Sequence, residues 1–492
     1  MSESAPSRAL LTDLYQLTMA AAYHASGLES TDACFHLFFR AAPFDGGYAV
    51  ACGLEQAIDY LDGLAFTAAD IAFLAKRTGN DGKPLFAAEF LGWLCDLRFE
   101  LDVDAVPEGT AVFAREPLVR VCGPIVQCQL VETALLNAIN FQTLVATKAS
   151  RVCTAAQGDP VVEFGLRRAQ GPDGGLSASR AAYVGGCAGT SNTLAGARYG
   201  IPVSGTHAHS WVMAWDNELD AFEAYAAALP NNCTFVVDTY DSLEGARHAV
   251  EVGRTLRERG HELIGVRIDS GDLAWLSKRV REILDEGGFP DARIVASNEL
   301  DEHLITSLKD QGARIDLWGV GTKLATAWDQ PALGGVYKLS AVRKPGESEW
   351  TPRVKVSEQT AKVTTPGVLG VRRYRRDDRT LAGDMVYDVN RPPVGEALMI
   401  DPADSTRRKQ FATEAAFEDL LVPVFRHGER VYDPPLIADI RARALASLSE
   451  LDPSITRFLN PHTYPVGLEK SVADVRTDLV LRARGLAENG RR

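Results

Sequence analysis

The stretch Leu263 to Glu286, with the sequence LIGVRIDSGDLAWLSKRVREILDE, is predicted to form a complete strand, loop and helix. Its first part, Leu263 to Ile268, is a short and mostly apolar run, as is typical of a strand inside a sheet. The next four residues, Asp269-Ser270-Gly271-Asp272, are polar, and Leu273 to Glu286 then has apolar residues at helical spacing. A strand followed by a helix is the unit of a parallel sheet, because consecutive parallel strands need a long crossover between them.

The same order of elements recurs between Val161 and Tyr337. Strands are predicted at Val161 to Phe164, Ile201 to Val203, Phe235 to Val237, Leu263 to Ile268, Arg293 to Ala296, Ile315 to Val320 and Gly335 to Leu339. Helices are predicted at Ser242 to Arg259, Leu273 to Glu286 and Glu299 to Gln311. Continuous apolar strands separated by helices indicate parallel strands that are buried on both faces. Six or seven such units predict a parallel α/β barrel that is irregular or incomplete.

The chain has a different pattern on either side of this region. Helices are predicted at Leu10 to Ser26, Leu54 to Leu61, Ala68 to Lys76, Leu85 to Asp96 and Val131 to Ala146, with a strand at Ala33 to Phe39 and a small antiparallel sheet between Arg98 and Val126. After Lys344 the sequence becomes charged and rich in proline, and its run Arg372 to Arg379 is expected to be a solvated hairpin end, with phosphate docking as the lesser alternative. We therefore expect helices plus a small sheet in residues 1–135, a catalytic barrel in 136–343 and a C-terminal segment in 344–492.

Composition narrows the class of protein. The chain has 492 residues, of which 46% are hydrophobic and 24% charged, so a large core is expected. A net charge of −13 argues against a general partner role for nucleic acid or an anionic membrane. No apolar run reaches the roughly 18 residues of a membrane span, and Met1 to Arg8 lacks an apolar signal core. The eight cysteines form no Cys-X-X-Cys motif, which favours buried, reduced thiols in a cytoplasmic protein.

Polar residues follow almost every predicted parallel strand. These strand ends are Glu163 to Arg168, Thr206 to Ser210, Asp238 to Asp241, Arg267 to Asp272, Ser297 to Glu299 and Gly319 to Lys323. Because the carboxyl ends of parallel strands meet on one face of a barrel, we expect these side chains to form an active site.

The residue types at these ends indicate an anionic, phosphate-bearing ligand. Arginine supplies a planar fork for carboxylates and phosphates, and four arginines are candidates for this role: Arg151, Arg167, Arg168 and Arg267. Gly319-Val320-Gly321-Thr322 offers backbone N–H groups and a hydroxyl as a phosphate cradle. Asp269 and Asp272 are candidates to hold Mg²⁺ beside a polyphosphate.

The segment Ser204 to Trp211 contains two histidines, His207 and His209, and three interpretations compete for them. They are either structural histidines at a strand end, a pair that chelates a metal, or the site of a nucleophilic, phosphate-accepting imidazole. A histidine among arginines and magnesium-type carboxylates favours phosphoryl transfer over zinc-dependent hydrolysis.

Several motifs together resemble the nicotinate phosphoribosyltransferase family. They are TDLYQLTM from Thr12 to Met19, EFGLRRAQGPDGG from Glu163 to Gly175, Gly205-Thr206 with His209-Ser210, VRIDSGDL from Val266 to Leu273, GVGT from Gly319 to Thr322, and GGVYKL from Gly334. The resemblance extends from about Leu10 to Leu339. It implies the irregular parallel α/β barrel of the type II phosphoribosyltransferases, with a second α/β sandwich domain built from the N- and C-terminal segments.

The resemblance also implies an activity. Members of the family join nicotinate to phosphoribosyl pyrophosphate, giving nicotinate mononucleotide and pyrophosphate in NAD biosynthesis, and they couple ATP hydrolysis to this reaction through a phosphohistidine. By motif position that histidine is His209, whereas His207 falls where the family usually has an apolar residue. ATP and Mg²⁺ are thus the expected cofactors, without a structural metal, and the expected assembly is a homodimer with shared active sites.

Individual residues follow from the same motif positions. His209 and Asp269 are the expected catalytic residues. Tyr15 and Thr206 match nicotinate-contacting positions, and Tyr15 is expected to reach the active site of a neighbouring subunit. Arg167 and Arg267 match arginines near the substrate carboxylate and phosphates, and Thr322 matches a contact to the phosphoribosyl phosphate. The expected vicinity of phosphate and magnesium also includes Arg151, Asp272, Gly319 and Gly321.

Three alternatives remain open at this point. Nicotinamide phosphoribosyltransferase is related, but it is expected to carry an aspartate before Thr-X-Ala-Gly, where this chain has Asn192 before Thr193-Leu194-Ala195-Gly196. A His-X-His metallohydrolase belongs to a different class of enzyme. A non-catalytic sensor of NAD metabolism is the third alternative, and the complete set of site motifs argues against it.

Overall fold

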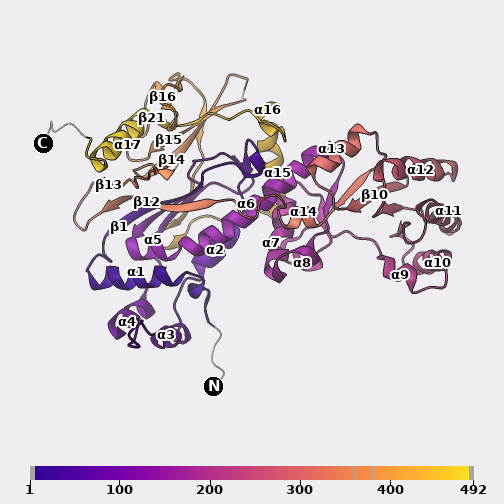
Figure 1. Cartoon of the computed structure of the whole chain (residues 1–492), viewed down its shortest axis with the longest axis horizontal. Coiled ribbons are helices and arrows are strands. Elements are labelled where there is room, and N and C mark those ends of the chain that lie inside the picture. Colours follow the sequence, from indigo (N-terminus) through magenta and orange to yellow (C-terminus); the bar gives the residue numbers. More distant parts are fainter. Residues whose placement is uncertain (1–5, 360–361, 379, 487–492) are drawn as a thin grey trace. The chain divides into compact units, whose positions relative to one another are not determined.

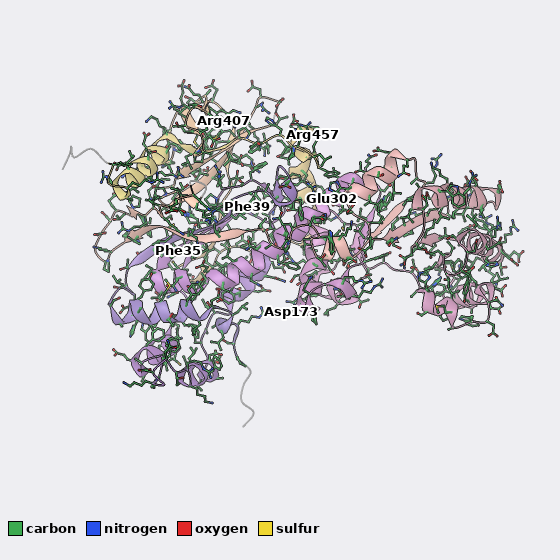
Figure 2. The ribbon with its side chains drawn as sticks, in the orientation of Figure 1. Phe35, Phe39, Asp173, Glu302, Arg407 and Arg457 are labelled. Atoms are coloured by element: carbon green, nitrogen blue, oxygen red, sulfur yellow. The ribbon has the colours of Figure 1, made fainter. Side chains whose placement is uncertain are left out.

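The computed structural model describes residues 6–359, 362–378 and 380–486, which form two compact units (Figure 1). Unit 1 contains the described residues up to Thr143, those of Ala332–Leu436 and those from Ala446 onward. Unit 2 contains Leu144–Pro331 and Ile437–Leu445. Two helices, α6 (Glu132–Ala155) and α15 (Ile437–Ser449), contain residues of both units. Figure 2 shows the side chains of both units, with Phe35 and Phe39 labelled in unit 1 and Glu302 in unit 2.

Unit 2 is built on a six-stranded parallel sheet. Its strands, in spatial order, are β7 (Gly189–Thr190), β6 (Val161–Glu163), β11 (Leu317–Val320), β10 (Arg293–Asn298), β9 (Gly265–Ile268) and β8 (Thr234–Val236). Its remaining helices are η3 (Leu166–Arg168), α7 (Gly171–Val184), α8 (Thr193–Tyr199), α9 (His209–Met213), α10 (Glu218–Ala228), α11 (Ser242–Glu258), α12 (Leu273–Glu286), α13 (Glu302–Asp310) and α14 (Thr322–Ala325). The prediction of repeated βα units is thus confirmed, whereas closure of the sheet into a barrel stays a prediction.

Two predicted strands are placed differently by the structure. Ile201 to Val203 does not form a strand, and Val203 makes only an isolated bridge with Thr190. Gly335 to Leu339 begins β12 (Gly335–Arg343), which pairs antiparallel with β1 (Asp32–Phe39) and therefore belongs to a sheet of unit 1. Counting this strand among the parallel ones was wrong, because a short apolar run indicates burial in a sheet without indicating which strand it will pair with.

Unit 1 contains two large sheets. One has the spatial order β13 (Thr351–Pro352), β12, β1, β5 (Val119–Pro124), β3 (Asp102–Ala105), β19 (Val422–Arg426) and β20 (Glu429–Arg430). The other has the order β17 (Arg408–Phe411), β16 (Ala397–Ile400), β21 (Val466–Glu469), β15 (Leu381–Asp388), β14 (Leu369–Arg375) and β18 (Phe417–Asp419), and a two-stranded sheet joins β2 (Ala49–Val50) to β4 (Ala111–Val112). Because β12 pairs with β1 and β19 pairs with β3, segments from the two ends of the chain share one sheet.

Short helices complete unit 1. They are η1 (Arg8–Leu10), α1 (Leu14–Ala25), η2 (Pro43–Asp45), α2 (Leu54–Asp62), α3 (Ala68–Ala75), α4 (Ala88–Asp96), α5 (Ile125–Leu130), α16 (Pro453–Thr456) and α17 (Lys470–Ala483). Among the described residues, no helix combines the length and apolar character that a membrane span requires. The unit boundaries at residues 143 and 331 differ from the predicted segment boundaries at 135 and 343. The predicted polar N-terminus, Met1 to Arg8, lies partly outside the described residues.

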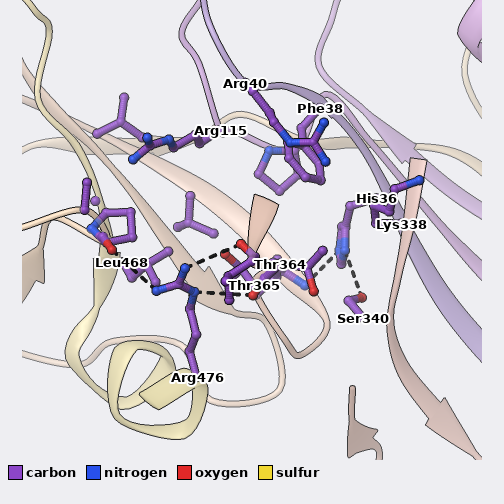
Figure 3. A pocket seen from close by; sticks show the side chains of 18 residues that line it. His36, Phe38, Arg40, Arg115, Lys338, Ser340, Thr364, Thr365, Leu468 and Arg476 are labelled. Atoms are coloured by element: carbon purple, nitrogen blue, oxygen red, sulfur yellow. Dashed lines mark hydrogen bonds between the residues drawn. The ribbon is translucent and has the colours of Figure 1, made fainter. Parts of the chain in front are cut away.

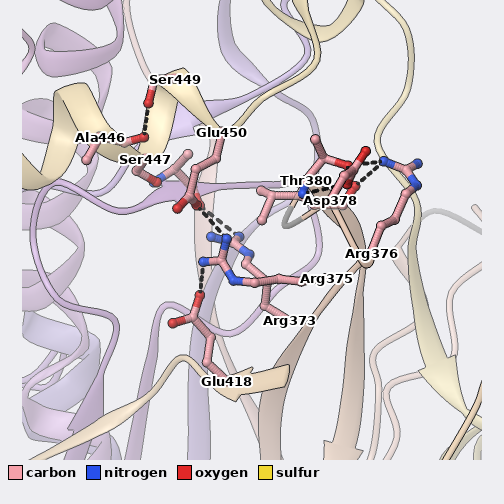
Figure 4. Close-up of polar contacts among 12 residues, drawn as sticks. Arg373, Arg375, Arg376, Asp378, Thr380, Glu418, Ala446, Ser447, Ser449 and Glu450 are labelled. Atoms are coloured by element: carbon pink, nitrogen blue, oxygen red, sulfur yellow. Dashed lines mark hydrogen bonds and ion pairs between the residues drawn. The ribbon is translucent and has the colours of Figure 1, made fainter. Parts of the chain in front are cut away.

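The arginine run at the end of β14, whose residues Arg373, Arg375 and Arg376 are labelled in Figure 4, is only partly the solvated hairpin end that the sequence predicts. Arg373 is 1% exposed, and it forms a bidentate ion pair with the equally buried Asp384 on β15 at 2.6 Å. Arg372 is also buried and pairs with Asp419 on β18 at 2.9 Å. The expectation of solvation was wrong for these two residues, because each meets a carboxylate on a neighbouring strand. It holds for Arg376 to Asp378, and Arg379 lies outside the described residues.

Candidate active site

Side chains at the carboxyl ends of β8, β9 and β10 contact one another in unit 2. Asp238, two residues after β8, accepts hydrogen bonds from the backbone N–H of Asp269 at 2.9 Å and from the hydroxyl of Ser270 at 2.6 Å. Ser297, near the end of β10, donates a hydrogen bond to Asp269. The register of the parallel strands explains this convergence, because Arg267 on β9 lies opposite Val236 on β8 and Val295 on β10.

Arg267 is the centre of this cluster. Its guanidinium donates from Nε to Ser297 Oγ at 2.7 Å, from Nη1 to Thr206 Oγ1 at 3.0 Å and from Nη2 to Asp269 Oδ1 at 2.9 Å. The same guanidinium lies 5.8 Å from the ring centroid of Phe164. Arg267 has two partners that are distant in sequence, Thr206 and Ser297, and one that is two residues away, Asp269. These three bonds fix the orientation of its guanidinium.

The environment of Asp269 favours its charged form. Burial on its own would raise the pKa of this carboxyl, but the hydrogen bond from Ser297 and the charge of Arg267 outweigh burial and hold the pKa below its ordinary value. A carboxylate that stays ionised and half-buried can orient a cation or a partly positive ring beside it. The ring beside Asp269 belongs to His209.

His209 is the first residue of the short helix α9, and its ring faces the carboxylates. Nδ1 lies 3.2 Å from Thr239 Oγ1, and Nε2 lies 3.5 Å from Asp269 Oδ2 and 3.9 Å from Asp238 Oδ1. The side chain is 37% exposed, so it can be reached from solvent. Asp238 belongs to one of the strand ends predicted to form the active site, but it was not among the residues predicted to have an individual role. Its position after a predicted strand, like that of Asp269, is the signal that could have singled it out.

His207 has a different environment although it is only two residues away. Its ring is 7% exposed and lies among the rings of Phe222, Tyr225 and Phe235. Nε2 accepts a hydrogen bond from the backbone N–H of Val236 at 3.2 Å, so Nδ1 carries the proton and donates to the carbonyl of Ala208 at 3.3 Å. Burial also lowers the pKa of this ring. His207 is therefore a neutral, structural histidine, and the His-X-His segment does not form a pair of metal ligands.

A buried carboxylate anchors the loop that carries Arg167. Glu163 is 1% exposed, and it accepts hydrogen bonds from the backbone N–H of Gly165 and from the hydroxyls of Ser179 at 2.9 Å and Thr190 at 2.6 Å. The following turn, η3, contains Arg167 and Arg168, both of which are exposed. These two arginines are thus available at the end of β6.

Asn192 contributes to the same network from inside the unit. Its side-chain oxygen caps α8 by accepting from the backbone N–H groups of Leu194 and Ala195, and its amide donates to Ser179 Oγ at 3.1 Å. The residue is 2% exposed. Asn192 thus has a structural role in this conformation, which an aspartate could share only in part because it has no amide donor.

The predicted phosphate cradle lies between β11 and α14. A side chain at Gly319 would place its Cβ 2.6 Å from the ring of Phe164, so a glycine is required there for the ring to pack beside Arg267. Gly321 precedes α14, whose first residue, Thr322, donates its hydroxyl to Glu299 at 3.0 Å. Gly321 and Thr322 are half-buried at the end of β11, whereas Gly319 is buried.

Three of the predicted site residues lie elsewhere or already have structural partners. Arg151 is 2% exposed and pairs with the buried Glu302 at 2.7 Å. Its guanidinium is therefore not accessible to a ligand at the carboxyl ends of the strands. Asp272 caps α12 by accepting from the backbone N–H of Trp275 at 3.0 Å. Tyr15 lies on α1 of unit 1 and is 51% exposed. The structure thus gathers Thr206, His209, Arg267 and Asp269 in direct contact or close to it.

The described residues of the site do not form a preformed binding site for a transition metal. Within the described residues, no group of three or more His, Cys, Asp or Glu side chains is arranged to hold a metal ion. However, Asp238 Oδ1 is buried and accepts no hydrogen bond from any described residue, and His209 Nε2 lies 3.9 Å from it. One or two carboxylates are what Mg²⁺ usually takes from a protein when phosphates supply its other ligands.

This arrangement defines a class of protein. A parallel α/β unit that gathers arginines, ionised carboxylates and a reachable histidine at its strand ends is typical of enzymes that transfer phosphate-bearing groups. Family models agree and are more specific. The nicotinate phosphoribosyltransferase (NAPRTase) N-terminal domain matches residues 10–140, the nicotinate phosphoribosyltransferase (NAPRTase) family matches 160–378, and the nicotinate phosphoribosyltransferase C-terminal domain matches 370–476. The chain belongs to the nicotinate phosphoribosyltransferase family.

Individual relatives support this assignment over almost the whole chain. Nicotinate phosphoribosyltransferase of Bacillus subtilis (strain 168) is 44% identical over 468 residues, which cover 94% of this chain and 93% of the relative. The crystal structure of human nicotinic acid phosphoribosyltransferase superimposes with a TM-score of 0.83 at 32% identity, covering 95% of this chain and 99% of that chain. A nicotinate-nucleotide pyrophosphorylase from Pyrococcus furiosus shares the fold, with a TM-score of 0.68 at 22% identity over 90% of this chain and 96% of its own.

The low pKa of Asp269 predicts a pH-dependent contribution to stability. A carboxyl whose pKa is lowered by folding stabilises the folded state above its unfolded pKa of about 3.9, and this contribution disappears as the pH falls through the folded pKa. Asp269→Asn should therefore lower the melting temperature near pH 7, and the difference from the parent protein should shrink below about pH 4. Melting curves between pH 7 and pH 3 measure this. The exposed Asp310 provides the control Asp310→Asn, and a constant difference for Asp269→Asn at every pH would contradict the assignment.

Proposed function

We propose that this protein joins nicotinate to phosphoribosyl pyrophosphate, forming nicotinate mononucleotide and pyrophosphate in NAD biosynthesis. The observation that carries this proposal is the set of three hydrogen bonds that the guanidinium of Arg267 donates to Ser297, Thr206 and Asp269. These bonds fix a cation at the carboxyl ends of the parallel strands. Family membership over 94% of the chain supports the same reaction. All eight cysteines are described by the structure and none forms a disulfide, which is consistent with a role in the reducing cytoplasm.

The reaction has requirements that these residues can meet. The ring nitrogen of nicotinate attacks the anomeric carbon, the bond from that carbon to pyrophosphate breaks, and the transition state resembles an oxocarbenium ion. We assign Thr206, Arg267 and Arg167 to the nicotinate carboxylate and the phosphates, because charge-assisted hydrogen bonds from arginine suit both groups. Thr322, with the backbone of Gly319 and Gly321, is assigned to the phosphoribosyl phosphate. Fixing a weak pyridine nucleophile in line with the anomeric carbon should supply much of the rate enhancement.

We assign ATP coupling to His209. An imidazole nitrogen attacks the γ-phosphorus of ATP, an N–P bond forms, and ADP leaves; water later cleaves the N–P bond and releases phosphate. Thr239 holds Nδ1, and Asp269 and Asp238 lie beside Nε2, so the ring has a defined orientation and a charged environment. Phosphorylation of the ring would add about −1.5 to −2 charges next to two carboxylates and so favour a rearrangement of the site.

Magnesium fits this site as a companion of the substrate phosphates. Asp269 and Oδ1 of Asp238 would hold it, and the ion would supply neutralising charge for the leaving pyrophosphate. We propose no structural metal.

Substrate choice is tested by measuring mononucleotide formation from nicotinate and from nicotinamide, each with and without ATP. Nicotinate with phosphoribosyl pyrophosphate should be converted, ATP should increase the rate, and nicotinamide should react far more slowly because an amide lacks the negative charge that Arg267 complements. Preferred use of nicotinamide would contradict the proposal, and it would point to the related nicotinamide enzyme.

His209 can be tested separately from the transfer reaction. His209→Ala should abolish both the labelled, acid-labile phosphoprotein and substrate-stimulated ATP hydrolysis, while slow mononucleotide synthesis without ATP should persist. The control His261→Ala changes a histidine that is bonded to Asn231 and not to the site, and it should behave as the parent protein. His207→Ala should keep the phosphoprotein but lose about 1–3 kcal/mol of stability, since Val236 N–H loses its buried acceptor. Label on His207, or ATP-stimulated synthesis at the parent rate in His209→Ala, would reject the assignment.

We also propose that the enzyme is a homodimer in which Tyr15 serves the active site of the partner subunit. The supporting observations are the exposure of Tyr15 together with Leu11, Leu14 and Met19 around α1, which is unusual for apolar side chains unless another surface covers them. Tyr15→Ala and His209→Ala homodimers should each lose ATP-coupled synthesis. After subunit exchange, a mixture of the two should regain activity, because each heterodimer contains one site with both residues intact. No recovery in a mixture with proven exchange would reject the shared site.

A further inference from the structure

Unit 1 contains a cavity of about 380 Å³ that the proposed reaction does not use (Figure 3). Residues of β1 and β12 line one side of it, and residues of β15 and β21 line another, so both large sheets contribute. The helix α17 adds Arg476, and the segment Val363 to Thr365 adds backbone carbonyls. The volume falls in the range of about 300–1,000 Å³ that small-molecule sites commonly have.

Four cationic side chains line this cavity: Arg40, Arg115, Lys338 and Arg476. The lining contains no aspartate or glutamate. Throughout the described residues, none of the four forms an ion pair with a carboxylate. Arg476 donates only to the carbonyls of Val363, Thr364 and Pro402, at 3.3–3.4 Å, and Lys338 donates to the carbonyl of Tyr337 at 2.7 Å. Positive charge is thus concentrated here without a counter-charge.

The electrostatics of the cavity reflect this imbalance. Burial, and then the charge of Arg115, lower the pKa of Arg476. Burial also lowers the pKa of Lys338, and Arg40 and Lys355 add to that effect while Glu132 opposes it. Like charges held close together in a partly buried site cost free energy, which a bound anion would recover. In Figure 3, Arg115 and Arg476 lie on opposite sides of the cavity.

His36 forms part of the wall but adds no charge. Its Nε2 accepts from the backbone N–H of Leu369 at 3.1 Å, so Nδ1 carries the proton and donates to Ser340 Oγ at 2.9 Å; Ser340 in turn donates to the carbonyl of Cys34 at 3.0 Å. Burial is the main reason that the pKa of His36 falls to about 3. The neutral imidazole thus joins the two sheets through β12 and β14 and keeps the cavity wall in place.

The backbone at Arg115 is also unusual. Its φ of +74° is a left-handed conformation that favours glycine, yet an arginine occupies it and is exposed. Strained positions of this kind are enriched at ligand sites, and here the strain accompanies a side chain that lines the cavity.

We propose that this cavity binds a small organic phosphate, whose phosphate is held between Arg115 and Arg476 and whose organic part lies against the apolar wall. Arginine forks suit the oxygens of a phosphate monoester, and several cations are needed to balance its two charges. The apolar wall consists of Phe38, Pro117, Leu369, Val386 and Leu468. Nucleotides and sugar phosphates share this chemistry.

The test is calorimetric titration of the full chain with AMP, ribose 5-phosphate and inorganic phosphate as probes. Because the strand-end site of unit 2 is also expected to bind phosphates, the titrations use Arg267→Ala as background, which removes its central cation. In that background AMP or ribose 5-phosphate should still bind one site per chain, at least ten-fold tighter than inorganic phosphate. Adding Arg115→Met or Arg476→Met should weaken this binding at least ten-fold. The control Arg482→Met changes an exposed arginine on the same helix, paired with Asp478, and should leave the affinity unchanged.

A second measurement separates ligand binding from a structural role of these arginines. Arg115→Met should not lower the melting temperature of the ligand-free protein, since the side chain has no carboxylate partner, but it should remove the rise in melting temperature that AMP produces. The proposal is overturned if the Arg267→Ala protein binds none of the probes, if inorganic phosphate binds as tightly as the organic phosphates, or if Arg115→Met and Arg476→Met leave binding unchanged. None of these results depends on turnover of nicotinate, so failure of this proposal is distinct from failure of the proposed function.

Discussion

The hydrogen-bonded fork of Arg267 is the interaction on which the candidate active site depends. Its three donors reach Thr206, Asp269 and Ser297, which come from three different parts of the chain. Asp269 stays ionised because of this arrangement, and the ionised Asp269 in turn lies beside His209. A change in the position of one guanidinium would therefore move Thr206, Asp269 and the neighbouring histidine together. Under the proposed function, this would couple substrate binding to phosphoryl transfer.

Buried cationic side chains have different partners in different parts of the molecule. Lys148 and Arg151 share Glu302 in unit 2, and Arg373 has Asp384 in unit 1. These pairs compensate the loss of hydration with direct ion contacts, and removing one partner would leave an uncompensated charge. Among the described residues, the cations around the cavity of unit 1 form no ion pair with a carboxylate, and Arg476 and Lys338 donate to backbone carbonyls instead. This contrast with the paired cations supports the proposal that the cavity binds an anion.

Several residues with reactive side chains turn out to have structural roles. His207 fills an aromatic pocket and accepts from a strand N–H, Asn192 and Asp272 cap helices, and Arg151 neutralises a buried glutamate. His207, Asn192 and Asp272 each lie within a few residues of a strand end or a site motif. Proximity in sequence to a functional residue is thus weak support for function, because a helix cap or a buried ion pair uses the same residue types.

The sequence by itself determined the repeated βα units of unit 2, the placement of Arg267 and Asp269 at the end of a strand, and the family. These features are local, because an apolar run, a helical period or a motif can each be recognised within a window of about 10 to 20 residues. Only the tertiary structure decided that Gly335–Arg343 joins β1, that Arg372 and Arg373 are buried, that Asp238 faces His209, and that four cations surround one cavity. The physical reason is that strand pairing, ion pairing and cavity formation depend on which distant segments of the chain come into contact. A short stretch of sequence indicates that its residues will be buried, but it does not indicate which other segment will cover them.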